Sequence, residues 1–128
     1  DEDRGALRMP GAIFEAELDL THPLCFGYER PRLPMFLNDT LFMETSRNPY
    51  ATPAVFTGNP LLAGYINPRQ RPLAAKAAAV VVGGIGKGRA ICFAGDPNFC
   101  AFWYGTNRLF ANAIFFGNLV NDEAVEKK

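Results

Sequence analysis

The chain has 128 residues, enough for one domain whose folding buries roughly two-thirds of the surface that the unfolded form exposes. Apolar residues make up 48% and charged residues 20%, as in an ordinary globular protein. Thirteen basic and thirteen acidic side chains give a formal net charge of zero. Because no basic stripe is present and no segment reaches the ~20 apolar residues of a membrane helix, we expect neither a nucleic-acid nor a membrane partner.

Charge and hydropathy divide the chain into three parts. We expect residues 1–10 to be a leader or linker, residues 11–120 to form a single domain, and residues 121–128 to be a charged tail. The opening DEDRGALRMPG has neither the apolar stretch nor the cleavage pattern of a signal peptide.

The first predicted strand is the segment GAIFEAELDL, residues 11–20, in which apolar and polar side chains alternate. This pattern predicts a half-buried strand with Phe14, Ala16 and Leu18 on its inner face. Residues 21–34 contain three prolines and a glycine, which predicts a surface loop.

The middle of the chain gives weaker signals. Residues 35–45 predict two short strands around a central Asn-Asp turn. Residues 46–60 predict a loop with a brief strand at residues 54–57. The segment LLAGYIN, residues 61–67, fits a strand or a single helical turn, and its periodicity does not decide between them. Residues 68–72, PRQRP, are expected to be a linker.

A glycine-rich turn predicts the clearest hairpin. Two apolar runs, residues 77–82 and 89–94, flank it, and their continuous Val and Ile residues predict strands buried on both faces. The turn GGIGKG fails the phosphate-binding loop pattern, because Val81 and Gly88 stand where that pattern needs Gly and Ser or Thr.

The last predicted element is a helix at about residues 107–120, where apolar residues recur every three or four positions. Thr106 or Asn107 is expected to cap its start. Together these elements predict an α/β, strand-rich domain with one C-terminal helix.

The segment between the last predicted strand and the helix is the candidate site. In open α/β sheets, ligands bind beyond the carboxyl ends of strands. On this analogy five side chains are candidate ligand-binding residues: Asp96, Asn98, Tyr104, Asn107 and Arg108. Trp103 is a sixth candidate, as an aromatic surface for a ligand beside Tyr104.

A structural interpretation of the same segment is favoured over ligand binding. Asp96 and Asn98 are expected to hold a turn, because both residue types bond to nearby backbone. Phe99, Phe102 and Trp103 are then expected to plug the end of the core.

The chain has three cysteines, at positions 25, 92 and 100, and one histidine, His22. An odd number of widely spaced cysteines excludes a disulfide scaffold. A zinc site would need four well-placed ligands, and Cys92 lies in the middle of an apolar strand, so we expect no metal ligand. His22 is the one imidazole base available to a thiol, but its Thr-His-Pro turn favours a structural role, so we expect no catalytic residue.

Two segments carry a family resemblance: GAIFEAELDLTHPLCFGY and GKGRAICFAGDPNFCAFWYGTNRLFANAIFFG. They resemble the carboxyl end of large bacterial zinc carboxypeptidase-like proteins of the M14 type. The most specific pieces are T-H-P-L and F-W-Y-G-T-N-x-L-F, within residues 11–119. In that family a peptidase domain is followed by a domain similar to class I glutamine amidotransferases, with a flavodoxin-like sheet. The resemblance therefore implies the strand-rich part of a flavodoxin-like fold.

The resemblance also implies a role. The chain is expected to be a non-catalytic accessory domain that supports the peptidase or its substrate, in a periplasmic or extracellular parent protein. The zinc and its H-x-x-E motif belong to the parent's peptidase domain, so no cofactor is expected in this chain. A peptidase domain in cis or a second copy is the expected partner, since part of such a domain would leave an apolar face or a sheet edge unpaired.

Two alternatives remain open. One is a cysteine-dependent, amidotransferase-like hydrolase with His22 as its base. The other is a carbohydrate- or peptide-binding module that uses Trp103 and Tyr104 as a surface platform.

Overall fold

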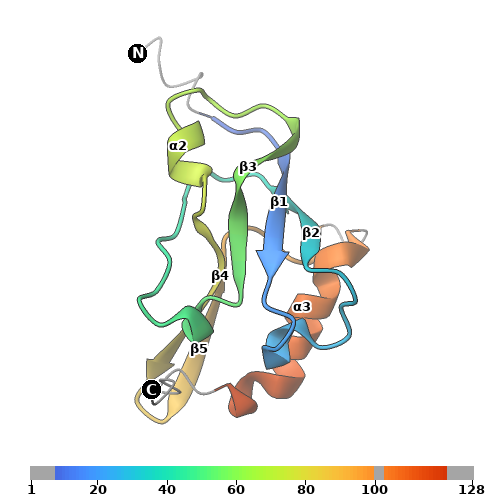
Figure 1. The fold of residues 1–128 in the computed structure, drawn as a ribbon, viewed down its shortest axis with the longest axis vertical. Coiled ribbons are helices and arrows are strands. Elements are labelled where there is room, and N and C mark those ends of the chain that lie inside the picture. Colours follow the sequence, from blue (N-terminus) through green and yellow to red (C-terminus); the bar gives the residue numbers. More distant parts are fainter. Residues whose placement is uncertain (1–7, 100–102, 121–128) are drawn as a thin grey trace.

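The computed structural model describes residues 8–99 and 103–120, which form a five-stranded sheet and one long helix (Figure 1). The strands are β1 (Ala12–Leu18), β2 (Arg32–Leu37), β3 (Ala54–Gly64), β4 (Ala78–Ile85) and β5 (Gly88–Phe93). The helical elements are η1 (Pro23–Cys25), η2 (Pro49–Ala51), α2 (Arg71–Ala74), α3 (Tyr104–Phe116) and η4 (Gly117–Leu119).

The predicted α/β class, rich in strands and closed by one C-terminal helix, is confirmed. The strand order is β2-β1-β3-β4-β5. Every strand pairing in the described part of the chain is antiparallel. A flavodoxin-like sheet is parallel, so that finer part of the expectation is not confirmed.

The strand β1, which pairs with β2 on one side and β3 on the other, follows the predicted alternation. Phe14, Ala16 and Leu18 are buried, as predicted, and the residues between them are half-buried or exposed. In the antiparallel register Phe14 lies opposite Met35 of β2, and Ala16 lies opposite Phe56 of β3. These residues share one face of the sheet, because side chains alternate along a strand, and that face carries the core.

The chain after β1 is not the predicted surface loop. His22, Leu24 and Cys25 are almost completely buried at η1, because this short helix turns under the sheet and α3 packs against it. The predicted pair of short strands at residues 35–45 is confirmed only in its first strand, which is the end of β2. The second strand is replaced by an isolated bridge between Met43 and Ala78, so the two do not form a hairpin.

β3 is far longer than the predicted strand at residues 54–57. It spans 11 residues and contains a bulge next to β1. Ala16 pairs with Phe56 and Phe14 pairs with Leu61, so a single β1 residue faces residues 57–60 of β3. A proline inside a strand is tolerated at such a bulge, and Pro60 lies there.

The β4–β5 hairpin is confirmed at the predicted glycine turn. Ile85 pairs with Gly88, and Gly86 has the positive φ of 58° that a two-residue loop demands at its first position. The expectation of burial on both faces is wrong for β5. This strand lies at the edge of the sheet, and Arg89 and Cys92 are exposed.

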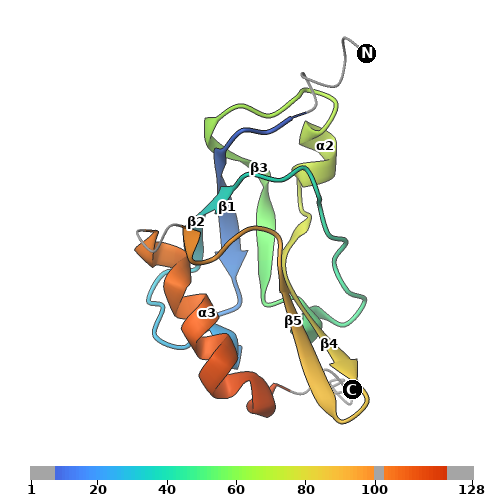
Figure 2. The ribbon, with the colours of Figure 1, turned by 180° about the vertical axis from the view of Figure 1, so that it is seen from behind.

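The chain leaving β5 crosses behind the sheet to β2, where α3 begins (Figure 2). The helix α3 begins at Tyr104, three residues before the predicted start. Neither predicted cap is used: the cap residue is Trp103, without a side-chain cap bond. The Thr106 hydroxyl instead donates to Pro97 O at 2.7 Å and ties the helix to the crossing segment.

Candidate functional site

The predicted turn before α3 is confirmed. Asp96 Oδ1 accepts a hydrogen bond from Asn98 N at 2.9 Å. The Phe99 ring lies 4.1 Å from that of Phe36, and Trp103 Nε1 donates to Pro34 O at 3.4 Å. These two positions of β2 alternate with its buried residues, so the aromatic side chains cover the outer face of β2 and its edge. The interpretation as a plug of the core is therefore wrong for Phe99 and Trp103, and Phe102 lies outside the described residues.

The other candidate residues lie along α3. Tyr104 is 76% exposed, Asn107 is half-buried, and an Arg108 guanidinium N–H donates to Gly27 O. The Arg108 guanidinium also lies 5.9 Å from the centre of the Tyr28 ring. None of the six candidates lines the pocket described below, and their binding of a ligand stays a prediction.

Two side chains that sequence reasoning missed hold α3 in place. The Tyr28 hydroxyl donates to Gly105 O at 2.6 Å and accepts from Leu109 N at 3.2 Å. Asn112, only 7% exposed, donates through Nδ2 to Leu24 O at 2.8 Å and to Phe26 O at 2.9 Å. The one signal in the sequence was an asparagine on the inner side of an otherwise apolar helix.

His22 and Cys25 lie together at η1 but are not arranged as a catalytic pair. His22 Nδ1 accepts from Leu24 N at 3.2 Å, and the Cys25 Sγ lies 3.7 Å from Pro53 O. Burial lowers the pKa of His22, and the Asp19 carboxylate and the Tyr50 backbone oppose this only in part. Burial raises the pKa of the Cys25 thiol to about 12, so this sulfur is held as an unreactive thiol near neutral pH.

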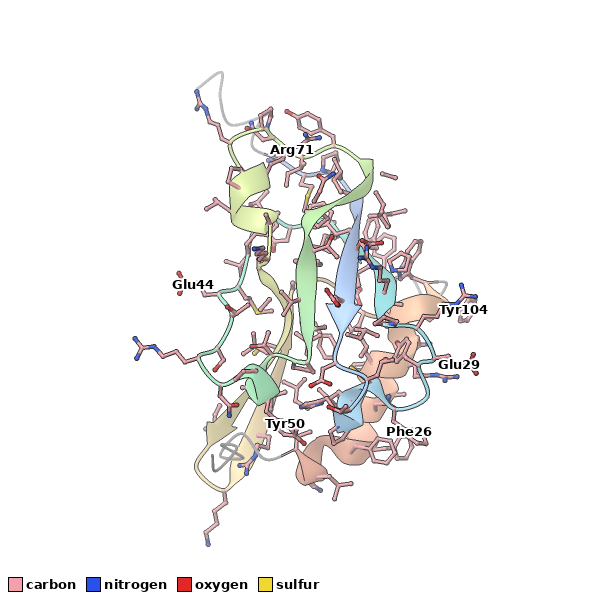
Figure 3. All side chains as sticks on the ribbon, viewed as in Figure 1. Phe26, Glu29, Glu44, Tyr50, Arg71 and Tyr104 are labelled. Atoms are coloured by element: carbon pink, nitrogen blue, oxygen red, sulfur yellow. The ribbon has the colours of Figure 1, made fainter. Side chains whose placement is uncertain are left out.

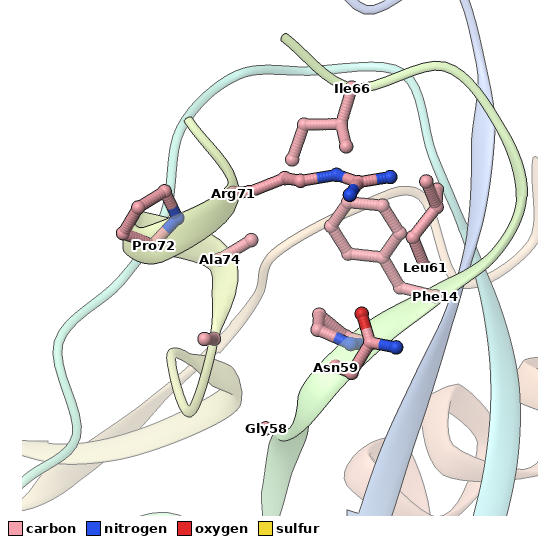
Figure 4. A pocket seen from close by; sticks show the side chains of 10 residues that line it. Phe14, Gly58, Asn59, Leu61, Ile66, Arg71, Pro72 and Ala74 are labelled. Carbon is pink, nitrogen blue, oxygen red and sulfur yellow. The ribbon is translucent and has the colours of Figure 1, made fainter. Parts of the chain in front are cut away.

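A pocket of about 220 Å³ lies between the β3 bulge and α2 (Figure 4). Its residues come from β1, from the bulge, and from residues 66–75: Phe14, Gly58, Asn59, Pro60, Leu61, Ile66, Arg71, Pro72, Ala74 and Ala75. The bulge forms one wall, because residues 57–60 leave the regular ladder there.

Most of the pocket wall is apolar, and one cation reaches into it. Arg71 extends from α2 across the pocket toward Leu61, between Ile66 and Phe14 (Figure 4). Arg71 is the single charged residue among the described residues that line the pocket, and Asn59 supplies a neutral amide. Sequence reasoning missed this site, because it read Gly58-Asn59-Pro60 as a loop and residues 68–72 as a linker.

A second surface feature is the outer face of α3, which we define as the exposed side chains of Tyr104, Phe110, Ile114, Phe115 and Leu119. Phe115 is 79% exposed and Ile114 is 66% exposed. Arg108 is the single charged residue between positions 104 and 119. Phe26 extends the apolar surface beside α3, and its ring packs edge-to-face on Phe116 at 5.6 Å (Figure 3).

Within residues 8–99 and 103–120, no three His, Cys, Asp or Glu side chains gather to hold a metal ion. None of the helices in the same part of the chain has the length and apolar character needed to span a bilayer. In comparisons with known protein families, with curated proteins and with solved structures, nothing matches the chain.

Proposed function

We propose that the chain is a non-catalytic accessory domain of a zinc carboxypeptidase-like protein of the M14 type. In this proposal it packs against the peptidase domain in cis, in a periplasmic or extracellular parent, and supports that domain or its substrate. The support from the sequence is the resemblance of the segments that contain T-H-P-L and F-W-Y-G-T-N-x-L-F. The zinc would be held by the peptidase domain, and we derive no chemical step through zinc in this chain.

The observation that carries the proposal is the outer face of α3. A surface helix normally buries its apolar residues and exposes its charged ones. In α3 the described inner side holds Thr106, Leu109 and Asn112, whereas Ile114 and Phe115 face outward. An exposed apolar surface of this kind, with Arg108 as its one charged side chain, is typical of a protein–protein contact.

The flavodoxin-like part of the expectation belongs to the same proposal. We propose that the antiparallel sheet is the strand-rich part of a larger amidotransferase-like domain, whose parallel strands come from a preceding segment. Two observations support it: the outer face of the sheet carries half-buried Ile13, Val55 and Val81, and β5 offers an edge with one strand partner in the described residues.

Both alternatives are less well supported by the geometry. A catalytic thiol needs a depressed pKa and an accessible base, whereas the pKa of Cys25 is raised and His22 is 1% exposed. The other described thiol, Cys92, is exposed on β5 and is far from His22 in sequence and sheet position. For a carbohydrate platform, Trp103 is half-buried and directs its indole N–H to Pro34 O.

The test is to express the surrounding reading frame with and without this chain. A zinc-peptidase segment with H-x-x-E should be encoded in the same frame. We expect the melting temperature of the peptidase segment to fall when this chain is deleted. With Ile114→Ser and Phe115→Ser in this chain, we expect a melting temperature between those of the intact protein and the deletion. Leu41→Ser is the matched control, because Leu41 is similarly exposed at 68% but lies in the segment after β2, outside α3.

Three results would contradict the proposal: a reading frame without a peptidase segment, a peptidase whose melting temperature is unchanged when this chain is deleted, or hydrolase activity of this chain alone. Light scattering of the isolated chain adds a further check. We expect self-association that the two serine substitutions abolish, since an uncovered outer face of α3 would pair with a second copy.

A further inference from the structure

The pocket between the β3 bulge and α2 combines a charge with an apolar lining. Arg71 brings a guanidinium to a wall formed by Phe14, Leu61 and Ile66. In residues 8–99 and 103–120, Arg71 has no ion pair and no side-chain hydrogen bond. Arg71 is an exposed residue, so its guanidinium is open to water and can pair with an incoming carboxylate without first giving up an existing ion pair.

The geometry points to a binding site for a small monocarboxylate with an apolar body. The carboxylate would pair with the Arg71 guanidinium, whose planar fork matches two carboxylate oxygens. The apolar body would lie against Phe14, Leu61 and Ile66, and the Asn59 amide stands at the same wall as a further hydrogen-bonding group. The inference is independent of the proposed function, because it concerns this chain alone.

Charge and size select this ligand class. A phosphate group carries up to two negative charges and is usually bound by several cations or backbone N–H groups, whereas the described pocket offers one cation. Its volume of about 220 Å³ is below the range of about 300–1,000 Å³ for drug-sized ligands. A singly charged group on a compact apolar body therefore fits best.

The bulge explains why the pocket persists in the fold. A regular β3 would stay paired with β4 along its length. The two strands pair only at residues 54–55, and α2 fills part of the space beside the rest of β3. Gly58 lies at the rim, and a Cβ there would meet nothing within 4 Å. Bulges often lie next to binding sites, where they re-aim side chains.

The experiment uses the whole chain and two matched probes. 4-Methylpentanoate carries the carboxylate on an apolar body, and 4-methylpentanamide is its uncharged analogue. In ¹⁵N–¹H NMR titrations we expect the acid to shift amides around the pocket, with the amide analogue binding at least about tenfold more weakly, since the charged hydrogen bonds are lost.

Three variants test whether the Arg71 guanidinium binds the carboxylate. Arg71→Gln should weaken binding of the acid by about tenfold or more, and Arg71→Lys should retain part of the affinity, because it keeps the charge and loses the fork. Arg69→Gln is the control, since Arg69 is also exposed but does not line the pocket. The dispersion of the same spectra reports whether each variant is folded.

Two further probes separate the sources of the carboxylate. Acetyl-Ala-Ala-Leu and its C-terminal amide test whether the ligand is a peptide end. Tighter binding of the peptide acid than of 4-methylpentanoate assigns a peptide C-terminus, and weaker binding assigns a small free acid. Equal binding of acid and amide probes, or an unchanged affinity in both Arg71 variants, would overturn the inference.

Discussion

The Tyr28 hydroxyl bridges Gly105 O and Leu109 N, the two backbone groups that an i→i−4 hydrogen bond pairs in the first turns of α3. It donates to Gly105 O at 2.6 Å and accepts from Leu109 N at 3.2 Å. A side chain from the segment between β1 and β2 is thus built into the backbone ladder of the last helix. The helix position is fixed by this contact and not by a cap at its own start, where Trp103 makes no side-chain cap bond.

Tyr28→Phe should therefore destabilise the fold by about 1 kcal/mol, because two hydrogen bonds are lost and the helix can close its own i→i−4 bond in their place. Urea unfolding followed by far-UV circular dichroism measures this. Tyr65→Phe is the matched control, since Tyr65 is 49% exposed, and it should change the free energy of unfolding little. Equal effects of the two substitutions would contradict the role of the hydroxyl.

Asn112→Asp should destabilise the fold more strongly, by roughly 2–4 kcal/mol, since a buried carboxylate would face the two carbonyl groups that the amide now donates to. The measurement is the shift of the urea midpoint. Asn118→Asp, at an exposed position just after α3, adds the same charge without burial and should leave the midpoint nearly unchanged.

Stability should fall as the pH is lowered through about 6.5, the ordinary pKa of histidine in the unfolded chain. The folded state lowers the pKa of His22 by burial, so below this pH the unfolded state binds the proton more readily. Above it both states are neutral and the stability is fully present. His22 is the single histidine, so His22→Asn, whose Oδ1 can accept from Leu24 N in place of Nδ1, should remove the slope between pH 7.5 and 5.5. A slope that survives in His22→Asn would show that other groups cause it.

Native Cys25 should resist iodoacetamide at pH 7.5, because it is buried and its pKa is raised to about 12. Cys92 is exposed and should be alkylated under the same conditions. Peptide mapping by mass spectrometry separates the two sites, and alkylation in 6 M urea is the control that exposes both. Fast native labelling of Cys25 would revive the hydrolase alternative.

Gly64→Ala should cost more stability than Gly86→Ala, although both glycines have a positive φ. A Cβ on Gly64 would lie 2.7 Å from Gly11 O, a backbone atom that cannot move aside without shifting β1. A Cβ on Gly86 would meet nothing within 4 Å, so only the cost of the left-handed backbone remains, about 1 kcal/mol. Thermal unfolding of the pair measures the difference, and similar melting temperatures would show that the strand ends are loosely packed.

Local sequence patterns were sufficient to predict the inner face of β1 and the β4–β5 turn. The alternation of residues 11–20 predicted the inner face of β1, and the glycines predicted the β4–β5 hairpin, because both signals depend on the period of a strand and on φ alone. The exposure of β5 could not be predicted, since its run of apolar residues after Arg89 does not reveal that the strand lies at an edge.

Long-range contacts determined what the sequence did not show. The Gly58-Asn59-Pro60 segment has the composition of a turn, yet it continues β3, because pairing with β1 on both sides of the bulge holds it in the sheet. The pocket joins Phe14 to residues 58–75, a juxtaposition that no local pattern encodes. Likewise, Asn112 and Tyr28 are 84 residues apart, and only the docking of α3 on η1 explains their roles.

The short pairing between β3 and β4 also has a mechanical consequence. Since β3 and β4 pair at only two positions, a short seam divides the sheet into a three-stranded part and a two-stranded ribbon. Amide exchange should therefore proceed faster in the ribbon than in β1, because fewer strand contacts must be broken for the ribbon to detach. Under force or heating, the β3–β4 pairing should therefore break first. The three-stranded part around β1 should unfold last.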